Sequence, residues 1–156
     1  MTNHIFSSSD KRKAFNHVGH FVQEDLEELK IAGSRYYRLA DIVLPSVTTV
    51  LSSGKNEGLE AWRDSIGHDV ANYIARTAAK TGTDFHRIAQ DYLSNKDTDL
   101  HRDMLYPFAH FDLIRDDLGR IDNIHALEAT LYSTRLGIAG RVDIVAEFDG
   151  ILSVID

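Results

Sequence analysis

The sequence has no cysteine, only two prolines and a single tryptophan among its 156 residues. Without cysteine the chain can form no disulfide framework, no thiolate zinc site and no cysteine nucleophile. No apolar run approaches the roughly 18–20 residues that a membrane-spanning helix needs, which excludes an integral membrane protein. The first ten residues also lack the apolar core of a secretory signal.

The acidic residues are unevenly distributed. Hydrophobic residues make up 43% of the chain and charged residues 26%, as in an ordinary globular protein. The net charge is −7, and residues 1–80 carry as many basic as acidic side chains, so the whole excess lies in the second half. An acidic half of this kind is either a solvated surface or a set of carboxylates gathered around a metal ion.

Short elements are expected in the first third of the chain. Residues 1–20 are polar and in places basic, which predicts an extended or loosely ordered segment. The segments Tyr36–Leu39 and Ile42–Leu44 are rich in residues that favour β-strands, which predicts a hairpin that ends at Pro45. Ser46 can then cap a short helix over Val47–Leu51.

Helices are expected in the middle of the chain. Apolar residues recur at steps of three and four from Leu59 to about Lys80, which predicts an amphipathic helix broken at Gly82. Thr83 is a candidate N-cap for a second helix. A third helix is expected from about residue 100 to 118, kinked or restarted at Pro107. The second helix would bury the stripe Phe85, Ile88, Ala89, Tyr92 and Leu93.

The apolar period changes to two near the end of the chain. Three antiparallel strands are predicted, over Leu127–Thr134, Ala139–Phe148 and Ile151–Asp156. The predicted fold is therefore of the α/β (α+β) class, with a helical N-terminal part followed by an antiparallel three-stranded meander.

Two turns set the expected register of these strands. Asp149-Gly150 favours a two-residue type I′ turn, which places Asp143 opposite Asp156. At the preceding turn, a pairing of Arg135 with Ile138 places Thr130 opposite Asp143 and turns Glu128 to the same face as both aspartates. A three-residue turn would instead turn Glu128 to the core face.

Carboxylates this close on one face repel each other. They persist if solvent screens them, if one is protonated, or if a cation such as Mg²⁺ binds between them. The alternative interpretation is that Glu128 is a surface residue and Asp156 a frayed end.

Four landmarks together resemble a known family. They are the Pro45–Leu51 segment followed by Leu59 and Trp62-Arg63, the Gly82–His86 segment, the run Gly140–Asp143 after Glu128, and the closing Val154–Asp156. In this order they resemble PD-(D/E)XK nucleases, and most closely the RecB-like branch that includes mitochondrial genome maintenance exonucleases and related phage exonucleases. The likeness spans residues 36–156, which would be the N-terminal portion of one nuclease domain with an incomplete restriction-endonuclease-like αβββαβ core. Residues 1–35 would be a loosely ordered N-terminal extension.

The resemblance implies a site and a reaction. His86, Asp143 and Asp156 would bind Mg²⁺ or Mn²⁺, while Asp143 and Asp156 together with Glu128 would be the catalytic carboxylates. Ser46, Thr48, Arg87 and Arg141 are candidates for contacting nucleic acid, since hydroxyls, amides and guanidinium groups bind phosphate. The implied activity is a metal-dependent DNA exonuclease acting on single strands or duplex ends.

The family pattern continues to a lysine beyond the second acidic residue, and this sequence ends at Asp156. Three explanations are open: a fragment of a longer enzyme, half of a split protein completed by a complementary C-terminal chain, or a copy that binds without cutting. The end within an apolar strand favours the first two, with weak metal binding and slight cleavage expected. The alternative function is therefore a non-catalytic nucleic-acid-binding or split-protein interaction module. A cytoplasmic location is expected (the host cytoplasm for a phage protein), with an organellar location left open.

Overall fold

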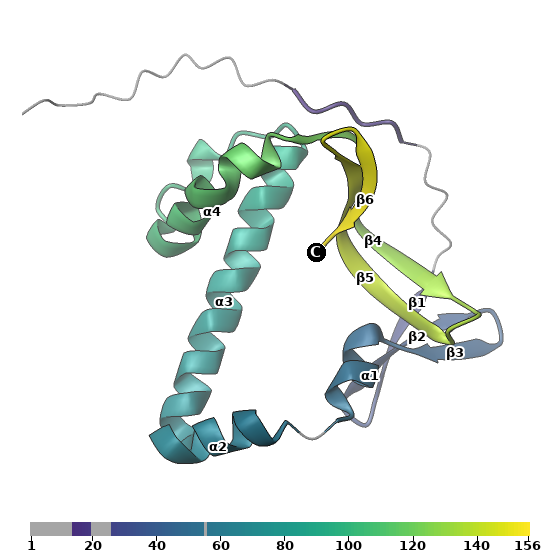
Figure 1. The fold of residues 1–156 in the computed structure, drawn as a ribbon, viewed down its shortest axis with the longest axis vertical. Coiled ribbons are helices and arrows are strands. Elements are labelled where there is room, and N and C mark those ends of the chain that lie inside the picture. Colours follow the sequence, from purple (N-terminus) through teal and green to yellow (C-terminus); the bar gives the residue numbers. More distant parts are fainter. Residues whose placement is uncertain (1–13, 20–25, 55) are drawn as a thin grey trace, which may run out of the picture.

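The fold combines helices with two small antiparallel sheets. The computed structural model describes residues 14–19, 26–54 and 56–156. The long helix α3 runs along one side of the molecule, α4 packs beside it, and both sheets lie across from them (Figure 1). The predicted α+β class is confirmed.

The first sheet has the strand order β1–β2–β3 and is antiparallel throughout. The predicted hairpin is confirmed as β2 (Ser34–Leu39) and β3 (Ile42–Pro45). β1 (Glu27–Ile31) lies where a loosely ordered extension was expected, so that expectation is wrong over this strand. The charged residues of β1 do not form the alternating apolar pattern that predicts a strand. Glu27 lies directly opposite Arg38 of β2, and the two side chains form an ion pair at 2.8 Å. Residues 1–13 and 20–25 lie outside the described part of the chain.

Helix α1 (Val47–Ser52) begins as the sequence predicts. The Ser46 hydroxyl accepts a hydrogen bond from the Thr49 backbone N–H at 2.9 Å, which is the expected N-cap. A side chain at Gly140 would come within 3.1 Å of Val47, so this glycine allows β5 to pass close to α1.

The long helical stretch is interrupted at a different residue from the predicted one. Helix α2 covers Glu57–Ile66 and α3 covers His68–Leu93, so the break falls at Gly67, whose φ is 87°. The predicted break at Gly82 is wrong, because one glycine inside a helix costs only about 1 kcal/mol relative to alanine. Thr83 is not an N-cap either, since its hydroxyl donates to the Ala79 carbonyl one turn earlier.

The third predicted helix is present in two pieces. A short 3₁₀ turn at Asp99–His101 precedes α4, which covers Leu105–Leu118. Pro107 lies in the first turn of α4, where its missing N–H breaks no helical hydrogen bond. The predicted restart of the helix is therefore confirmed, with the new helix beginning two residues before Pro107.

The second sheet has the order β4–β5–β6, with β4 over Ile121–Ser133, β5 over Ile138–Phe148 and β6 over Ile151–Ile155. The predicted β5–β6 register is confirmed, because Phe148 lies opposite Ile151.

The predicted β4–β5 register is wrong by two residues, because Ser133, not Arg135, lies opposite Ile138. The connecting turn spans residues 134–137 and is longer than expected. An even shift leaves each side chain on its predicted face.

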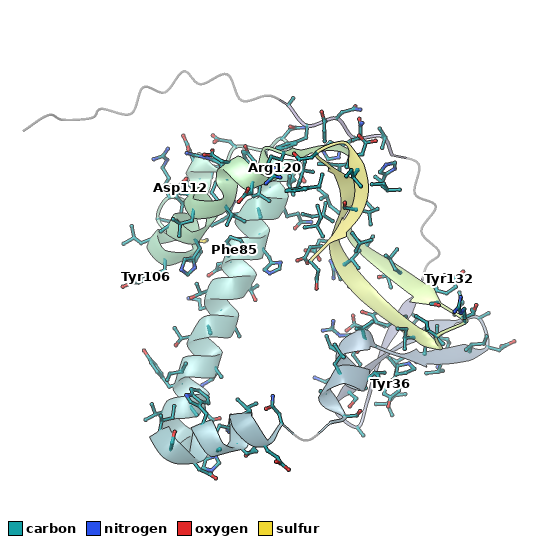
Figure 2. The ribbon with its side chains drawn as sticks, in the orientation of Figure 1. Tyr36, Phe85, Tyr106, Asp112, Arg120 and Tyr132 are labelled. Atoms are coloured by element: carbon teal, nitrogen blue, oxygen red, sulfur yellow. The ribbon has the colours of Figure 1, made fainter. Side chains whose placement is uncertain are left out.

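The main core lies between α3, α4 and the second sheet, where side chains from all three fill the space (Figure 2). One edge of this sheet is partly covered, because the backbone of residues 16–18 bonds to Ile124 of β4. None of the helices in the described ranges is long and apolar enough to cross a membrane. The fully buried side chains of the core include Ile88, Leu93, Phe111, Ile121 and Ile124.

Asp91 near the end of α3 stabilises the following turn. Its carboxylate accepts a hydrogen bond from Lys96 at 2.8 Å and contacts His101 Nε2 at 2.8 Å, with both Asp91 and His101 mostly buried. The bond from Lys96 lowers the pKa of Asp91 below its ordinary value of 3.8, burial opposes this effect, and His101 adds to it. The ionised carboxylate therefore contributes stability above pH 3.8, and this contribution is lost as the pH falls through the lower folded pKa.

We expect Asp91→Asn to lower the free energy of unfolding by about 2 kcal/mol at pH 7. The deficit should shrink as the pH is lowered from about 5 toward 2. Urea unfolding across this range measures both effects. Asp99→Asn is the control, because Asp99 forms an exposed ion pair with Arg102. A deficit that stays constant with pH would contradict the assignment.

Candidate metal centre

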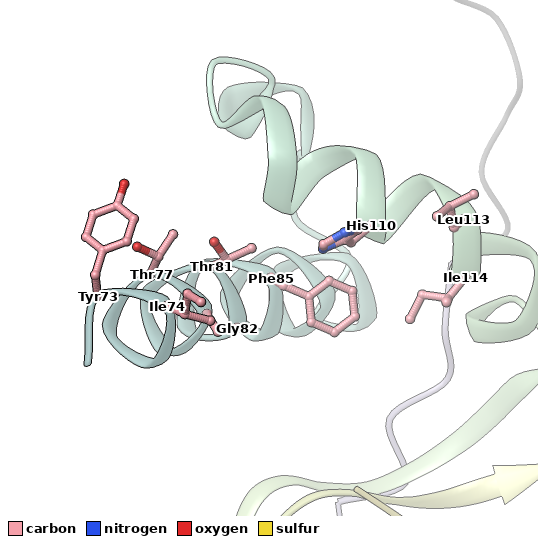
Figure 3. A pocket seen from close by; sticks show the side chains of 10 residues that line it. Tyr73, Ile74, Thr77, Thr81, Gly82, Phe85, His110, Leu113 and Ile114 are labelled. Atoms are coloured by element: carbon pink, nitrogen blue, oxygen red, sulfur yellow. The ribbon is translucent and has the colours of Figure 1, made fainter. Parts of the chain in front are cut away.

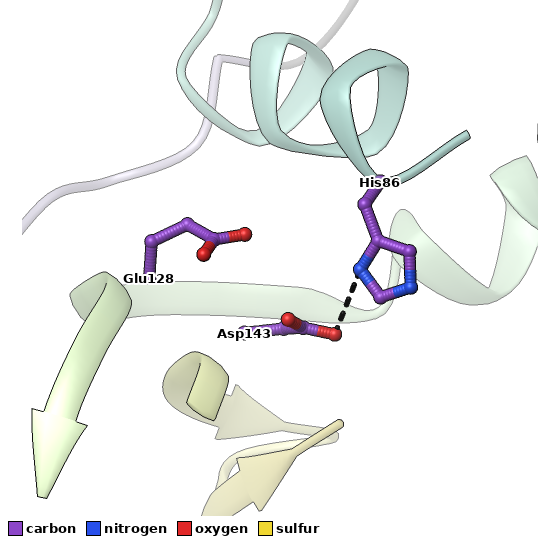
Figure 4. A group of neighbouring side chains, drawn as sticks. All are labelled: His86, Glu128 and Asp143. Carbon is purple, nitrogen blue, oxygen red and sulfur yellow. Dashed lines mark ion pairs between the residues drawn. The ribbon is translucent and has the colours of Figure 1, made fainter. Parts of the chain in front are cut away.

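Three side chains from distant parts of the sequence meet beside α3. His86 comes from α3, Glu128 from β4 and Asp143 from β5, and one ligand atom from each lies within 4.8 Å of the others (Figure 4). The Nδ1 atom of His86 is 3.0 Å from Oδ2 of Asp143. A histidine nitrogen and two carboxylate oxygens thus converge on one point.

The cluster opens into a cavity of about 270 Å³ between α3, α4 and the second sheet. Asp156 also lines this cavity, as does Gln90, one helical turn after His86. The other walls are mostly apolar, so the polar atoms are concentrated at the cluster. The apolar lining includes Phe85, Leu93, Ile114, Leu118, Leu127 and Ile144.

Helix periodicity places His86 at this cavity. Its neighbour Phe85 packs against the core, and Ile88 is fully buried, which fixes the rotation of α3. His86 lies on the flank of this apolar stripe, and its ring meets that of Phe85 edge-on at 5.6 Å. The imidazole is half exposed and points toward β5.

Glu128 has an unusual backbone for a residue within a strand. Its φ is 54°, in the left-handed region, where a residue with a side chain costs about 1–2 kcal/mol. Leu127 and Ala129 on either side keep regular pairing with Ile144 and Val142 of β5. Asn123, earlier in β4, also has a positive φ of 46°, but Glu128 is the left-handed residue of the strand that contributes to the cluster.

Asp143 lies in an unfavourable environment for a charged carboxylate. Burial raises its pKa above 3.8, His86 opposes this shift, and the nearby charges of Asp156 and Glu128 raise the pKa further. Arg141 lowers it, as the smallest of these influences. Three carboxylates thus share one cavity with too few positive charges, and a bound cation would relieve this repulsion.

The structure places three of the four predicted metal ligands and catalytic carboxylates in one close cluster. His86, Asp143 and Glu128 form the close cluster. Asp156 lines the same cavity and affects the pKa of Asp143, but it is not one of the three clustered residues. Their roles stay predictions. The sequence did not single out Gln90, although its spacing of four from His86 on one helix is a signal that could have found it.

The four predicted nucleic-acid contacts are scattered. Ser46 is only 2% exposed, and its hydroxyl is used in capping α1, which leaves it no free surface for a phosphate. Thr48 is exposed but lines a separate polar cavity with Arg35. Arg87 pairs with Asp84 at 3.5 Å. Arg141 alone of the four reaches the cluster, where its Nε forms an ion pair with Glu128 Oε2 at 2.7 Å.

A larger hollow of about 700 Å³ lies next to the cluster cavity, between α3 and α4 (Figure 3). Phe85 and Ile114 line both. The hollow has mainly apolar walls, including the side chains of Tyr73, Ile74 and Leu113. His110, one of the histidines without ligand spacing in the sequence, lies in its wall rather than at the cluster.

The residues of the cluster fit a divalent cation. Carboxylate oxygens and a histidine nitrogen are both common protein ligands of divalent metal ions, so a set of one histidine and two carboxylates suits such an ion. The pKa of Asp143 is raised mainly by burial and further by the neighbouring carboxylates, both of which a bound cation would offset. The fold and the site together are those of an α+β protein with a candidate metal centre on a helix–sheet cavity.

Comparison with known proteins gives one distant relative. The chain is 29% identical over 123 residues to human mitochondrial genome maintenance exonuclease 1. The match covers 73% of this chain and 36% of that protein, so the chain spans about a third of the length of its relative. No model of a protein family matches the chain. The chain is thus distantly similar to a protein named as an exonuclease.

Proposed function

We propose that the chain is the metal-binding part of a metal-dependent DNA exonuclease of the PD-(D/E)XK superfamily, RecB-like branch. The observation that carries the proposal is the meeting of His86, Glu128 and Asp143 within 4.8 Å. They come from two separate sequence landmarks of the resemblance, and all three lie in one cavity. The similarity to an exonuclease supports the same reading.

The roles of the residues follow from their chemistry. Asp143 and His86 would hold the cation, with Asp156 as a further carboxylate at the cavity. A bound Mg²⁺ or Mn²⁺ would supply Lewis-acid stabilisation of the charge that develops on a scissile phosphate. Glu128 would contribute a carboxylate oxygen at the cation and would accept a hydrogen bond from the attacking water, which orients that water. Arg141 would offer N–H groups to a phosphate oxygen.

The substrate and the setting are part of the proposal. The substrate would be DNA, as single strands or duplex ends, in replication or repair. The lysine of the family pattern would come from a continuation of the chain or from a complementary C-terminal chain. The location would be cytoplasmic, or the host cytoplasm for a phage protein.

The proposal predicts slow, metal-dependent degradation of DNA labelled at one end. Labelled single-stranded and duplex DNA are incubated with the protein and Mn²⁺ or Mg²⁺, with EDTA as a blank. Extending the chain by a short segment that carries the lysine of the family pattern should raise the rate about a hundredfold or more, since a group that activates the nucleophile contributes on that scale.

Cleavage that persists in EDTA would contradict metal dependence. Mn²⁺ binding without cleavage, even in the extended chain, would favour the non-catalytic module instead.

A further inference from the structure

The face of the second sheet at the cluster carries an unusual arrangement of charge. Thr130 lies opposite Arg141, and the same register places Glu128 across from Asp143, so these four side chains share one face of β4 and β5. Two carboxylates directly opposite each other on a sheet repel, and this repulsion destabilises the pairing of the strands. Among the described residues, Arg141 provides the basic side chain that forms an ion pair with one of these two carboxylates, that of Glu128.

The contact between Arg141 and Glu128 is diagonal across the two strands. It is an ion pair that joins Nε of Arg141 to Oε2 of Glu128 at 2.7 Å. The Glu128 side chain is only 23% exposed, whereas that of Arg141 is 52% exposed. The half-exposed side chain of Arg141 thus restrains the largely buried carboxylate of Glu128 and lies on the side of it that faces solvent.

The backbone of Glu128 gives the ion pair with Arg141 a role. The left-handed φ of 54° departs from the extended geometry of the strand, so pairing with β5 sets the face on which Glu128 lies but not the direction of its carboxylate. Arg141 pairs with one carboxylate oxygen, Oε2. A carboxylate oxygen of Glu128 also lies within 4.8 Å of a ligand atom of His86 and of one of Asp143.

We propose that Arg141 is a positioning residue that holds Glu128 in the geometry required for cation binding. This inference rests on the proposed metal site. It assigns to Arg141 a role before any substrate is present, in addition to a contact with phosphate.

The sign of the effect on cation binding separates positioning from simple electrostatics. Removing a positive charge near a cation site should strengthen cation binding if Arg141 acts through its charge alone. Removing a group that orients a ligand should weaken binding, by about tenfold for partners of this kind.

The experiment measures Mn²⁺ affinity of the intact chain, from the electron paramagnetic resonance signal of free Mn²⁺. Arg141→Gln should weaken binding about tenfold. Arg141→Lys, which keeps the charge but loses the planar guanidinium, should lose less. Arg115→Gln is the matched control, because Arg115 is equally exposed and pairs with Asp112 on α4. In a Glu128→Gln background, Arg141→Gln should no longer weaken binding.

The possible outcomes are distinct. Unchanged or tighter Mn²⁺ binding by Arg141→Gln, with a native circular dichroism spectrum, would overturn the positioning role while leaving the metal site intact. An equal loss in the Glu128→Gln background would also overturn it, since the effect would not pass through Glu128. No Mn²⁺ binding by the unaltered chain would overturn the proposed metal site and this inference together.

Discussion

Asp143→Asn is expected to weaken Mn²⁺ binding about a hundredfold or more. Loss of an outer partner of a ligand already costs 10–100-fold in affinity, and Asp143 is the carboxylate that His86 and Glu128 both approach. Asparagine keeps the shape of the side chain and one oxygen, so the loss reports the charge. The same electron paramagnetic resonance titration of Mn²⁺ measures it.

The same substitution should leave the fold intact. Burial and the neighbouring carboxylates raise the pKa of Asp143, so its ionised form is disfavoured in the folded protein. A neutral amide removes that repulsion and gives up only a partly exposed pair with His86, worth about 1 kcal/mol at most. Urea unfolding without metal should therefore show little change.

Asp112→Asn is the matched control for this prediction. Asp112 is an exposed carboxylate on α4, paired with Arg115 at 3.1 Å and absent from the cluster cavity. Its loss changes the net charge by the same amount and should not change Mn²⁺ affinity. If Asp143→Asn bound Mn²⁺ as tightly as this control, the cation would bind elsewhere and the proposed site would be wrong.

The parts of the fold that local chemistry determines could be predicted from the sequence. Asp149-Gly150 strongly favours a tight hairpin, and its register is correct. Ser46 caps α1 through its own hydroxyl, again a local effect. The Leu136-Gly137 turn gives a weaker signal, because several loop lengths accommodate a left-handed glycine, and here the prediction missed by two residues.

Two features were predicted wrongly because the local pattern does not decide them. Gly67 and Gly82 look alike in the sequence, but only Gly67 adopts a positive φ. Gly82 lies within α3 with open space around it, and its cost of about 1 kcal/mol is too small to end the helix. The charged strand β1 was missed because its stability comes from pairing with β2 rather than from an apolar pattern.

The candidate site was predictable only in part, for a related reason. Strand alternation places Glu128 and Asp143 on one face, and the even register error preserved this result. The approach of His86 depends on how α3 packs against the sheet, and only the resemblance to a family indicated it. The pattern of residue types does not indicate the left-handed backbone of Glu128 or its ion pair with Arg141.

The largest effect on stability is expected for Phe111→Ala. Phe111 is fully buried in the main core, where its ring packs against Tyr92 at 5.2 Å and Phe108 at 5.7 Å. Truncating a buried phenylalanine leaves a cavity and costs about 3–5 kcal/mol. Since small domains are stable by only about 5–15 kcal/mol, this variant should lose a large part of its stability. Urea unfolding followed by circular dichroism measures the loss.

Leu113→Ala on the same helix is the control for Phe111→Ala, because Leu113 is 80% exposed and should cost less than about 0.5 kcal/mol. The pair of variants also tests how the core supports the site. Phe111 joins α4 to α3 through Tyr92, and α3 carries His86, so loosening this contact should weaken Mn²⁺ binding even where the protein remains folded. Equal stability of the two variants would show that α4 does not pack on α3 as described. Weakened binding in Phe111→Ala alone would show that packing between the helices holds His86 at the cluster.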